Sequence, residues 1–416
     1  MTETNWARNV TYTATEIHHP ASLAELRSLV AGRDKIRALG TRHAFNTLAD
    51  TPDELVSVAN LPRTVEVDSA AATVRVSAGL RYAEIAEEVD RAGFALPNLA
   101  SLPHISVAGA TATATHGSGV GNGSLATSVA ALELVTATGD LLRLDRGHED
   151  FAGAVVSLGA LGVVTSLTLD LVPSFDIRQY VYTGLPLGSD LLAVLGGAYS
   201  VSLFTDWKTD VINQVWIKQL GDGVPELPAT RSAVQLHPVP GNPPEYCTQQ
   251  LGVPGRWYER LPHFRPEFTP SAGDELQAEF MVARADAALA LQAINQIRDR
   301  VHPVLQVSEI RTIAADEQWL SPYHQRDTVS IHFTWIADTP AVLPVIKLVE
   351  RQLEPFDPRP HWAKLFSIAP RTVRSRYPRL PDFQALARRL DPAGKFGNPM
   401  LSGLLELPGA QLSPDW

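Results

Sequence analysis

The chain is poor in cysteine, lacks an excess of basic residues and has no apolar run in its first twenty residues. Cys247 is the single cysteine among 416 residues, which excludes an internal disulfide and a cysteine-ligated metal cluster. The formal net charge of -10 disfavours a nucleic-acid partner, because nucleic acid binds to a basic face. Residues 1–20 contain neither a basic start nor an apolar run, so no signal peptide is expected. Together these absences indicate a cytoplasmic protein without a metal site.

A membrane span is not expected either. Residues 151–169, FAGAVVSLGALGVVTSLTL, carry no charge and are nearly long enough to cross a bilayer. However, Gly159 and Gly162 interrupt the segment, and its second half is rich in β-branched residues. We therefore interpret it as a small-residue helix, a glycine turn and a buried strand.

Helix and strand patterns are mixed along the N-terminal part of the chain. Ser22 can cap a helix that Gly32 ends, and residues 81–93 have a second amphipathic helical pattern. A hairpin is expected to turn at residues 138–140. After Pro173 the sequence is richer in tryptophan, proline and polar loops, and it then contains three strand-like stretches, VSEIRTI, TVSIHFTWI and HWAKLFSI. These patterns predict an α+β protein in which a second domain packs over an N-terminal ligand domain.

Charge is absent altogether from residues 92–132, whose centre reads ISVAGATATATHGSG. Backbone N–H groups in turns and at helix ends can bind phosphate without side-chain charge, and glycine allows close approach. The Walker, G-x-S-x-G and H-E-x-x-H motifs are missing, and GSGVGNG does not have the G-x-G-x-x-G spacing. Composition alone leaves two alternatives, a tightly packed buried turn or a pyrophosphate site.

Two further motifs favour the ligand site: GTRHAFN at residues 40–46 and DPAGKFGN at residues 391–398. With SLPHISVAGATATATHGSG they resemble the vanillyl-alcohol oxidase family of FAD enzymes, most of all its bacterial alditol oxidases. The likeness extends from NWARN at Asn5 to GKFGN. It implies a two-lobed FAD-binding domain (1–175), an α+β cap domain for the substrate, built on an antiparallel sheet (176–370), and a C-terminal segment that closes back on the flavin site (371–416).

The resemblance implies that both loops bind the FAD diphosphate mainly through backbone amides. His43 lies where alditol oxidases attach the flavin covalently through its 8α-methyl group; for a lone loop histidine the alternative is a hydrogen-bonding role. Its neighbours here are Arg42 and Ala44, where the family usually has glycine and serine. The expected cofactor-binding residues are Thr41, Arg42, His43, Ala44, Phe45, Asn46, Ala100, Ser101, Ser106, Gly109, Thr113, Thr115, His116, Gly117, Val163 and Val164.

Alternation along the later strands predicts a polar face. Residues two apart share one side of a strand, so Glu309 and Arg311 should point together, as should His332 and Thr334. On the third stretch, Lys364 should point to the face opposite to that of Ala363 and Leu365. A half-exposed sheet whose polar face meets water would have the same pattern.

The resemblance makes this face the wall of an active site. The expected substrate-binding residues are Ser101, Glu309, Arg311, Thr334 and Lys364. The expected catalytic residues are Arg311, Lys364, His332 and Glu309, with His332, oriented by Glu309, accepting the substrate proton.

The implied reaction oxidises the terminal primary hydroxyl of an alditol such as xylitol or sorbitol to the aldose. Hydride passes to flavin N5, and O2 is reduced to hydrogen peroxide. One alternative is a polyol or aldonolactone dehydrogenase with another electron acceptor, and a second is a carbohydrate-binding protein that uses tryptophans as stacking platforms. Related enzymes imply a monomer.

Overall fold

The computed structural model describes residues 3–268 and 274–407. A five-stranded antiparallel sheet organises the N-terminal lobe, in the order β4 (Val65–Asp68), β5 (Thr73–Ser77), β9 (Val163–Asp170), β7 (Val129–Val135) and β8 (Leu141–Asp145). A small parallel sheet lies beside it, in the order β1 (Glu16–His18), β3 (Glu54–Val56) and β2 (Arg37–Ala38). Shorter elements of this lobe are β6 (Phe94–Ala95), α3 (Val107–Ala112) and β10 (Val172–Pro173).

Local signals in this lobe are confirmed. The helix α1 (Leu23–Ala31) begins after Ser22, whose side chain accepts a hydrogen bond from the Glu25 N–H. The helix α2 (Tyr82–Arg91) buries its apolar face. The charge-free segment 151–169 folds as α4 (Phe151–Val155), a glycine turn and β9. None of the helices in the described residues has the length and apolar content needed to cross a bilayer.

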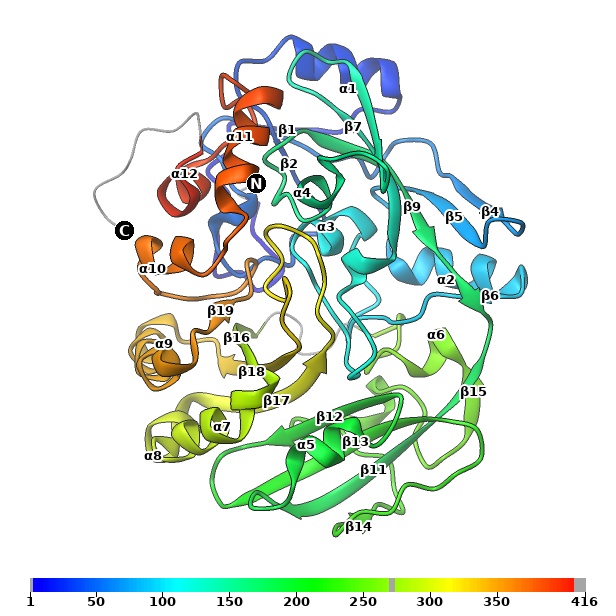
Figure 1. Ribbon diagram of the computed structural model, residues 1–416, viewed down its shortest axis with the longest axis vertical. Helices are drawn as coiled ribbons and strands as arrows, with labels where there is room; N and C mark the ends of the chain where they lie inside the picture. The colour runs from blue at the N-terminus through cyan, green and yellow to red at the C-terminus, as the bar shows by residue number, and fades with distance from the viewer. Residues whose placement is uncertain (1–2, 269–273, 408–416) are drawn as a thin grey trace.

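The second lobe is a nine-stranded antiparallel sheet, which Figure 1 shows below the N-terminal lobe. Its strands follow the order β14 (Thr230–Arg231), β11 (Asp176–Pro186), β13 (Val211–Leu220), β12 (Ser200–Thr205), β17 (Leu305–Ile313), β18 (Thr328–Ile336), β16 (Glu275–Ala283) and β19 (Arg359–Pro360), with β15 (Pro254–Arg256) also paired to β11. The sheet therefore confirms the predicted antiparallel α+β cap, while the boundaries at residues 175 and 370 remain a prediction.

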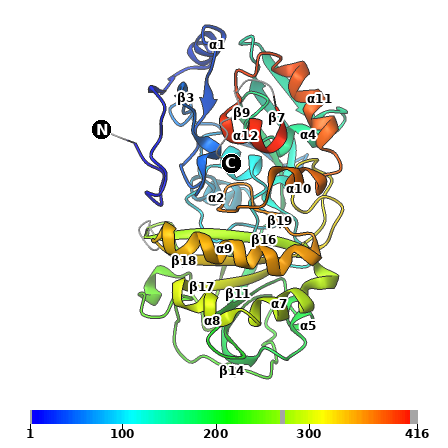
Figure 2. The same ribbon diagram turned by 90° about the vertical axis from the view of Figure 1, so that its left-hand side faces the viewer.

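Helices cover one face of this sheet, as Figure 2 shows for α9. The apolar residues Ile310, Ile331 and Phe333 pack in one core cluster with the helices, which leaves the opposite face free for polar side chains. The helices of this lobe are α5 (Leu191–Gly196), α6 (Trp257–Arg260), α7 (Ala287–Asn295), α8 (Arg298–Val301) and α9 (Thr339–Leu353).

The predicted strand HWAKLFSI is wrong, because β19 ends at Pro360 and a turn follows. The His361 N–H donates to the Glu279 carbonyl, and the Leu365 N–H donates to the Gln277 carbonyl at 2.8 Å. Between these two contacts the chain leaves the sheet. The Asn46 amide donates to the carbonyl oxygens of Trp362 and Lys364, both at 2.8 Å, and so replaces strand pairing with a contact to the N-terminal lobe.

The C-terminal segment returns to the N-terminal lobe, beside which its helices α10 (Pro370–Ser375), α11 (Leu380–Leu390) and α12 (Pro399–Leu405) lie in Figure 1. In the motif DPAGKFGN, Lys395 Nζ donates to the carbonyls of Val30 and Ala137, each at 2.7 Å. The Asn398 amide donates to the carbonyls of Thr47, Leu48 and Asp50. The motif therefore anchors residues 47–50, which directly follow the loop at residues 40–46.

Candidate active site

A cavity of about 340 Å³ lies between the loop at residues 40–45, the charge-free stretch and the polar face of the nine-stranded sheet. All the predicted site residues line it except Asn46 and Gly117. A Cβ on Gly117 would lie 2.3 Å from Asn98 Oδ1, so Gly117 packs against the neighbouring chain instead. The predicted alternation is confirmed, since Glu309, Arg311, His332 and Thr334 all face this cavity.

Free backbone donors line one end of the cavity. The Leu39 N–H donates to the Val56 carbonyl and the Phe45 N–H to the Ala363 carbonyl. Between them, the N–H groups of residues 40–44 have no acceptor in the described part of the chain. These residues line the cavity, and a row of unpaired amides facing a cavity fits an anionic ligand such as a diphosphate.

The two glycine-containing loops form one continuous surface. A Cβ on Gly40 would lie 3.1 Å from Ser106 Oγ, and a Cβ on Gly109 only 2.8 Å from the same atom. The Ser106 N–H also donates to Thr41 Oγ1 at 3.2 Å. A larger residue at either position would push these loops apart, which explains the glycines at 40 and 109.

His43 is held at the same end of the cavity by the N-terminal segment. Its ring stacks on Trp6, with centroids 5.6 Å apart and planes at 23°. Its Nδ1 lies 3.1 Å from Thr41 Oγ1. Burial lowers the pKa of His43 to about 4, so the ring is neutral near pH 7. A neutral imidazole keeps the lone pair that a nucleophile needs.

Arg42 has a conformation that favours glycine. Its φ of 65° lies in the left-handed region, which costs an L-residue about 1 kcal/mol or more. Its guanidinium pairs with the carboxylate of Glu3, and the Trp6 N–H donates to its carbonyl oxygen at 2.8 Å. Arg42 thus fastens the N-terminal segment over the loop that carries His43.

A fully buried carboxylate, Glu279 on β16, organises the part of the cavity wall that the nine-stranded sheet forms. Its Oε1 accepts hydrogen bonds from Arg311 Nη2 at 2.9 Å and His116 Nε2 at 3.0 Å. Its Oε2 accepts one from Lys364 Nζ at 2.6 Å. Burial alone would raise the pKa of Glu279, but Lys364, His116 and Arg311 outweigh burial and hold the pKa well below its usual range.

The ring nitrogens of His332 contact Lys364 and Thr334, and neither contacts Glu309, the partner predicted for it. Its Nδ1 is 2.8 Å from Lys364 Nζ, and its Nε2 is 3.1 Å from Thr334 Oγ1. Burial and Lys364 lower the pKa of His332 to about 4, so its Nδ1 accepts from the lysine near pH 7. Burial also lowers the pKa of Lys364.

The prediction that Glu309 orients His332 is wrong. Glu309 and His332 are opposite one another in the β17–β18 ladder, but Glu309 Oε1 lies 2.7 Å from His263 Nε2. His263 belongs to a loop that also contacts the N-terminal lobe, since its N–H donates to the Ser101 carbonyl. Strand alternation carries no information about a loop residue, so the sequence did not predict His263 as the partner of Glu309.

Glu279 was also missed, although the sequence contained a signal. Glu275, Gln277 and Glu279 repeat every second residue of β16, and all three line the cavity. The period is the one that predicted the polar faces of β17 and β18. Lys218, which is buried on β13 and bonded to His263, gave no such signal because polar and apolar residues do not alternate regularly along β13.

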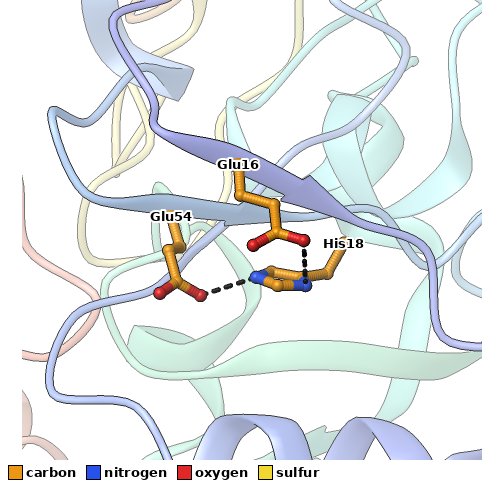
Figure 3. A group of neighbouring side chains, drawn as sticks. All are labelled: Glu16, His18 and Glu54. Atoms are coloured by element: carbon orange, nitrogen blue, oxygen red, sulfur yellow. Dashed lines mark hydrogen bonds and ion pairs between the residues drawn. The ribbon is translucent and has the colours of Figure 1, made fainter.

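One group outside the cavity has the side chains of a metal site. Glu16, His18 and Glu54 offer atoms within 4.8 Å of one another (Figure 3). The imidazole lies between the two carboxylates, with Nε2 2.6 Å from Glu54 and Nδ1 3.6 Å from Glu16. Glu54 also accepts from Arg33 Nε at 2.6 Å. One ion can use only one ring nitrogen, so this arrangement fits ion pairs that join β1 to β3 better than a metal centre.

On acidification, the free energy of unfolding should begin to fall at a pH well above the pKa of an ordinary carboxylate. Burial lowers the pKa of His263 and His332 to about 4, from 6.5. Between these values the unfolded chain binds more protons than the folded one, so the free energy of unfolding should fall as pH falls from about 6.5 to 4. Urea unfolding of the FAD-loaded protein at a series of pH values measures this. Constant stability across that window would contradict the burial of these rings.

Comparison with known proteins agrees with this geometry. Residues 17–145 match the model of an FAD binding domain, and residues 275–404 match that of D-arabinono-1,4-lactone oxidase. The chain is 57% identical, over 97% of its length and 99% of the relative, to an alditol oxidase of Streptomyces sp. (strain IKD472 / FERM P-14339). The chain belongs to the alditol oxidase family. Its cofactor is FAD, for which the free amides of residues 40–44 and the glycine contacts are suited.

More distant relatives and solved structures also match this family member. The L-gulono-1,4-lactone dehydrogenase of Mycobacterium tuberculosis is 27% identical over 95% of the chain and 96% of the relative. The crystal structure of cholesterol oxidase from B. sterolicum has a TM-score of 0.79 at 16% identity, covering 97% of this chain and 96% of that one. A xylooligosaccharide oxidase from Myceliophthora thermophila has a TM-score of 0.74 at 12% identity, with coverages of 98% and 94%. The two solved structures confirm the fold, an FAD-binding lobe with an α+β cap.

Proposed function

We propose that the protein oxidises the terminal primary hydroxyl of alditols such as xylitol and sorbitol to the aldose, with O2 as acceptor and hydrogen peroxide as product. The observation that carries this proposal is that one cavity is lined both by a row of free amides and by Arg311, Lys364 and the carboxylates with which they pair. The 57% identity to an alditol oxidase supports the same substrate class.

The polar end of the cavity suits a ligand with many hydroxyl groups and no charge. Arg311 and Lys364 donate hydrogen bonds, Glu309 accepts them, and Thr334 can do either. Arg311 Nη1 also lies 3.4 Å from Ser101 Oγ, which adds a hydroxyl from the N-terminal lobe. An unmatched buried polar group costs about 1–3 kcal/mol, so a site of this kind discriminates against substrates that lack a hydroxyl.

Lys364 and His332 are suited to remove the substrate proton. We assign Lys364 Nζ the role of receiving the hydroxyl proton while one of its own protons passes to His332 Nδ1, 2.8 Å away. Glu279, 3.7 Å from His332 Nδ1, stabilises the imidazolium that results. Bound FAD supplies the hydride acceptor. This assignment keeps His332 as the final proton acceptor but places Lys364 between it and the substrate.

His43 is the residue that we propose to link covalently to the flavin. The support is its place in the cavity wall, its neutral ring and its stack on Trp6. The alternative for this residue is hydrogen bonding without a link. We also propose a monomer in the cytoplasm, a location that a chain with one buried cysteine suits.

The function is tested with the purified protein, xylitol and sorbitol. Xylitol should bleach the flavin absorbance without air, and under air it should yield hydrogen peroxide. Acid precipitation of the same sample should leave the yellow colour in the pellet if His43 carries the flavin, and a His43→Ala variant should lose it to the supernatant. A yellow protein that neither polyol reduces would contradict the proposed substrate.

A lactone dehydrogenase is the second candidate, because residues 275–404 match a lactone oxidase model and one relative is a lactone dehydrogenase. The relative that bears that name is only 27% identical, against 57% for the alditol oxidase. Reduction by an aldonolactone but not by xylitol, with a dye but not O2 as acceptor, would favour this candidate.

A further inference from the structure

The two carboxylates that contact Arg311 differ in how many of their oxygens are occupied. Both oxygens of Glu279 accept hydrogen bonds, from Arg311, His116 and Lys364. Glu309 uses only Oε1, which lies 2.7 Å from His263 Nε2 and 3.5 Å from Arg311 Nε. Its Oε2 has no partner among residues 3–268 and 274–407, although Glu309 lines the cavity. Of these two carboxylates, Glu309 is therefore the one whose second oxygen, Oε2, can accept a hydrogen bond from a ligand.

The orientation of Glu309 depends on a buried pair behind it. Burial alone would raise the pKa of Glu309, but Arg311 and His263 hold the pKa well below its usual range, so the group is ionised and can only accept. His263 must then carry its hydrogen on Nε2. In that tautomer Nδ1 is an acceptor, and Lys218 Nζ lies 3.1 Å from it. The order of donation is thus Lys218 to His263 to Glu309.

The ring of His263 is fixed on its other sides as well. Trp216 and Phe204 contact it edge-on, with centroids 5.1 Å and 5.7 Å away. Ser202 Oγ lies 3.3 Å from Nε2, farther than Glu309. Lys218 is 1% exposed and donates also to the Leu261 carbonyl, so its amine cannot move toward solvent. Burying a lysine here costs free energy that an apolar residue on the same strand would not.

We propose that Lys218 and His263 are positioning residues that hold Glu309 with one oxygen bound and the other free to accept a hydrogen bond from a substrate hydroxyl, and so set the affinity for polyols. The inference rests on the proposed function, because it takes the ligand of Glu309 to be a polyol. His263 lines the cavity, but its two ring nitrogens are bonded to Glu309 and Lys218, and Lys218 does not line the cavity. The predicted effect is therefore on KM and not on kcat.

Steady-state kinetics of the FAD-loaded protein with xylitol and sorbitol test the proposal. His263→Leu should raise KM by about tenfold or more, as expected when a hydrogen bond to a charged group is lost, while kcat changes by less than about threefold. His263→Gln, which can still present a donor nitrogen to Glu309, should recover most of the affinity. Lys218→Met should raise KM in the same direction, because His263 loses the donor that fixes its tautomer.

A double-mutant cycle distinguishes a role of His263 in positioning Glu309 from a general loss of packing around the site. In a Glu309→Gln background, His263→Leu should have little further effect on KM, because the group that it orients is already lost. Thr248→Val is the matched control: its hydroxyl donates to the backbone carbonyls of Pro262 and His263 but contacts neither the His263 ring nor Glu309, so KM should stay unchanged.

Three results would overturn the positioning role: an unchanged KM in His263→Leu, additive effects in the cycle, or an equal rise in KM in Thr248→Val. If His263→Leu does not bind FAD, the His263→Gln and Lys218→Met variants decide the question by the same KM and kcat criteria. Absence of polyol turnover by the wild-type protein would instead contradict the proposed function, and so the two failures are distinguishable.

Discussion

Replacing Lys364 by methionine should slow the anaerobic reduction of bound flavin by xylitol by at least about 100-fold, the scale of a lost general acid–base group. The amine donates to Glu279 at 2.6 Å and to His332 at 2.8 Å, so its removal breaks the only path that we assign to the substrate proton. Methionine has a similar length and no charge, and FAD content should be unchanged because the amine of Lys364 contacts Glu279 and His332 and none of residues 40–44. Stopped-flow absorbance at the flavin bands measures the rate.

The control for this variant is Lys208→Met, which removes an exposed lysine whose side chain is 63% accessible. It should reduce flavin at the wild-type rate. Equal rates in Lys364→Met and the wild type would remove Lys364 from the proton path. A parallel loss of FAD would instead assign to Lys364 a role in holding the cofactor.

Replacing Glu279 by glutamine should lower the free energy of unfolding by about 3 kcal/mol or more, the cost of leaving a buried charge without its partner. Arg311 and Lys364 both donate to this carboxylate, and glutamine offers them only one neutral oxygen. The side chain keeps its shape, so the loss is electrostatic and not a cavity effect. Urea unfolding followed by circular dichroism, with FAD bound, measures the change.

The comparison variant is Glu66→Gln on β4. Glu66 pairs with Arg75 at 3.6 Å, but 68% of its side chain is accessible, so its loss should change stability by less than about 1 kcal/mol. If both substitutions had the same small effect, Glu279 would not be the counterion on which the buried cluster depends. The rate of flavin reduction should also fall in Glu279→Gln, since Lys364 and Arg311 lose their common anchor.

The sequence predicted the parts of this protein that depend on periodicity. Strand alternation correctly placed Glu309, Arg311, His332 and Thr334 on one face, because β17 and β18 are regular and buried on the other side. The glycine-bounded loops were recognised because close backbone approach requires small residues, whatever the rest of the fold.

What the sequence could not predict depends on contacts between distant segments. Lys364 reaches the cavity from a turn. The Asn46 amide binds the carbonyl oxygens of Trp362 and Lys364, which in a strand would pair with the neighbouring strand. His263 is the partner of Glu309 only because a loop folds back over β17. The two-residue period of β16 would have revealed Glu279, but not that three donors from separate segments converge on it.

Asn46 joins the loop that precedes it to the turn that carries Lys364, by two hydrogen bonds across the lobes. Chimeras that exchange the cap with that of a relative would cut through this link unless residues 44–46 and 361–365 are transplanted together. A graft that transplants both segments together should preserve the spacing between flavin and lysine. A graft that separates them should yield a protein that folds and binds FAD but turns over slowly, because the two lobes no longer have the native relative position.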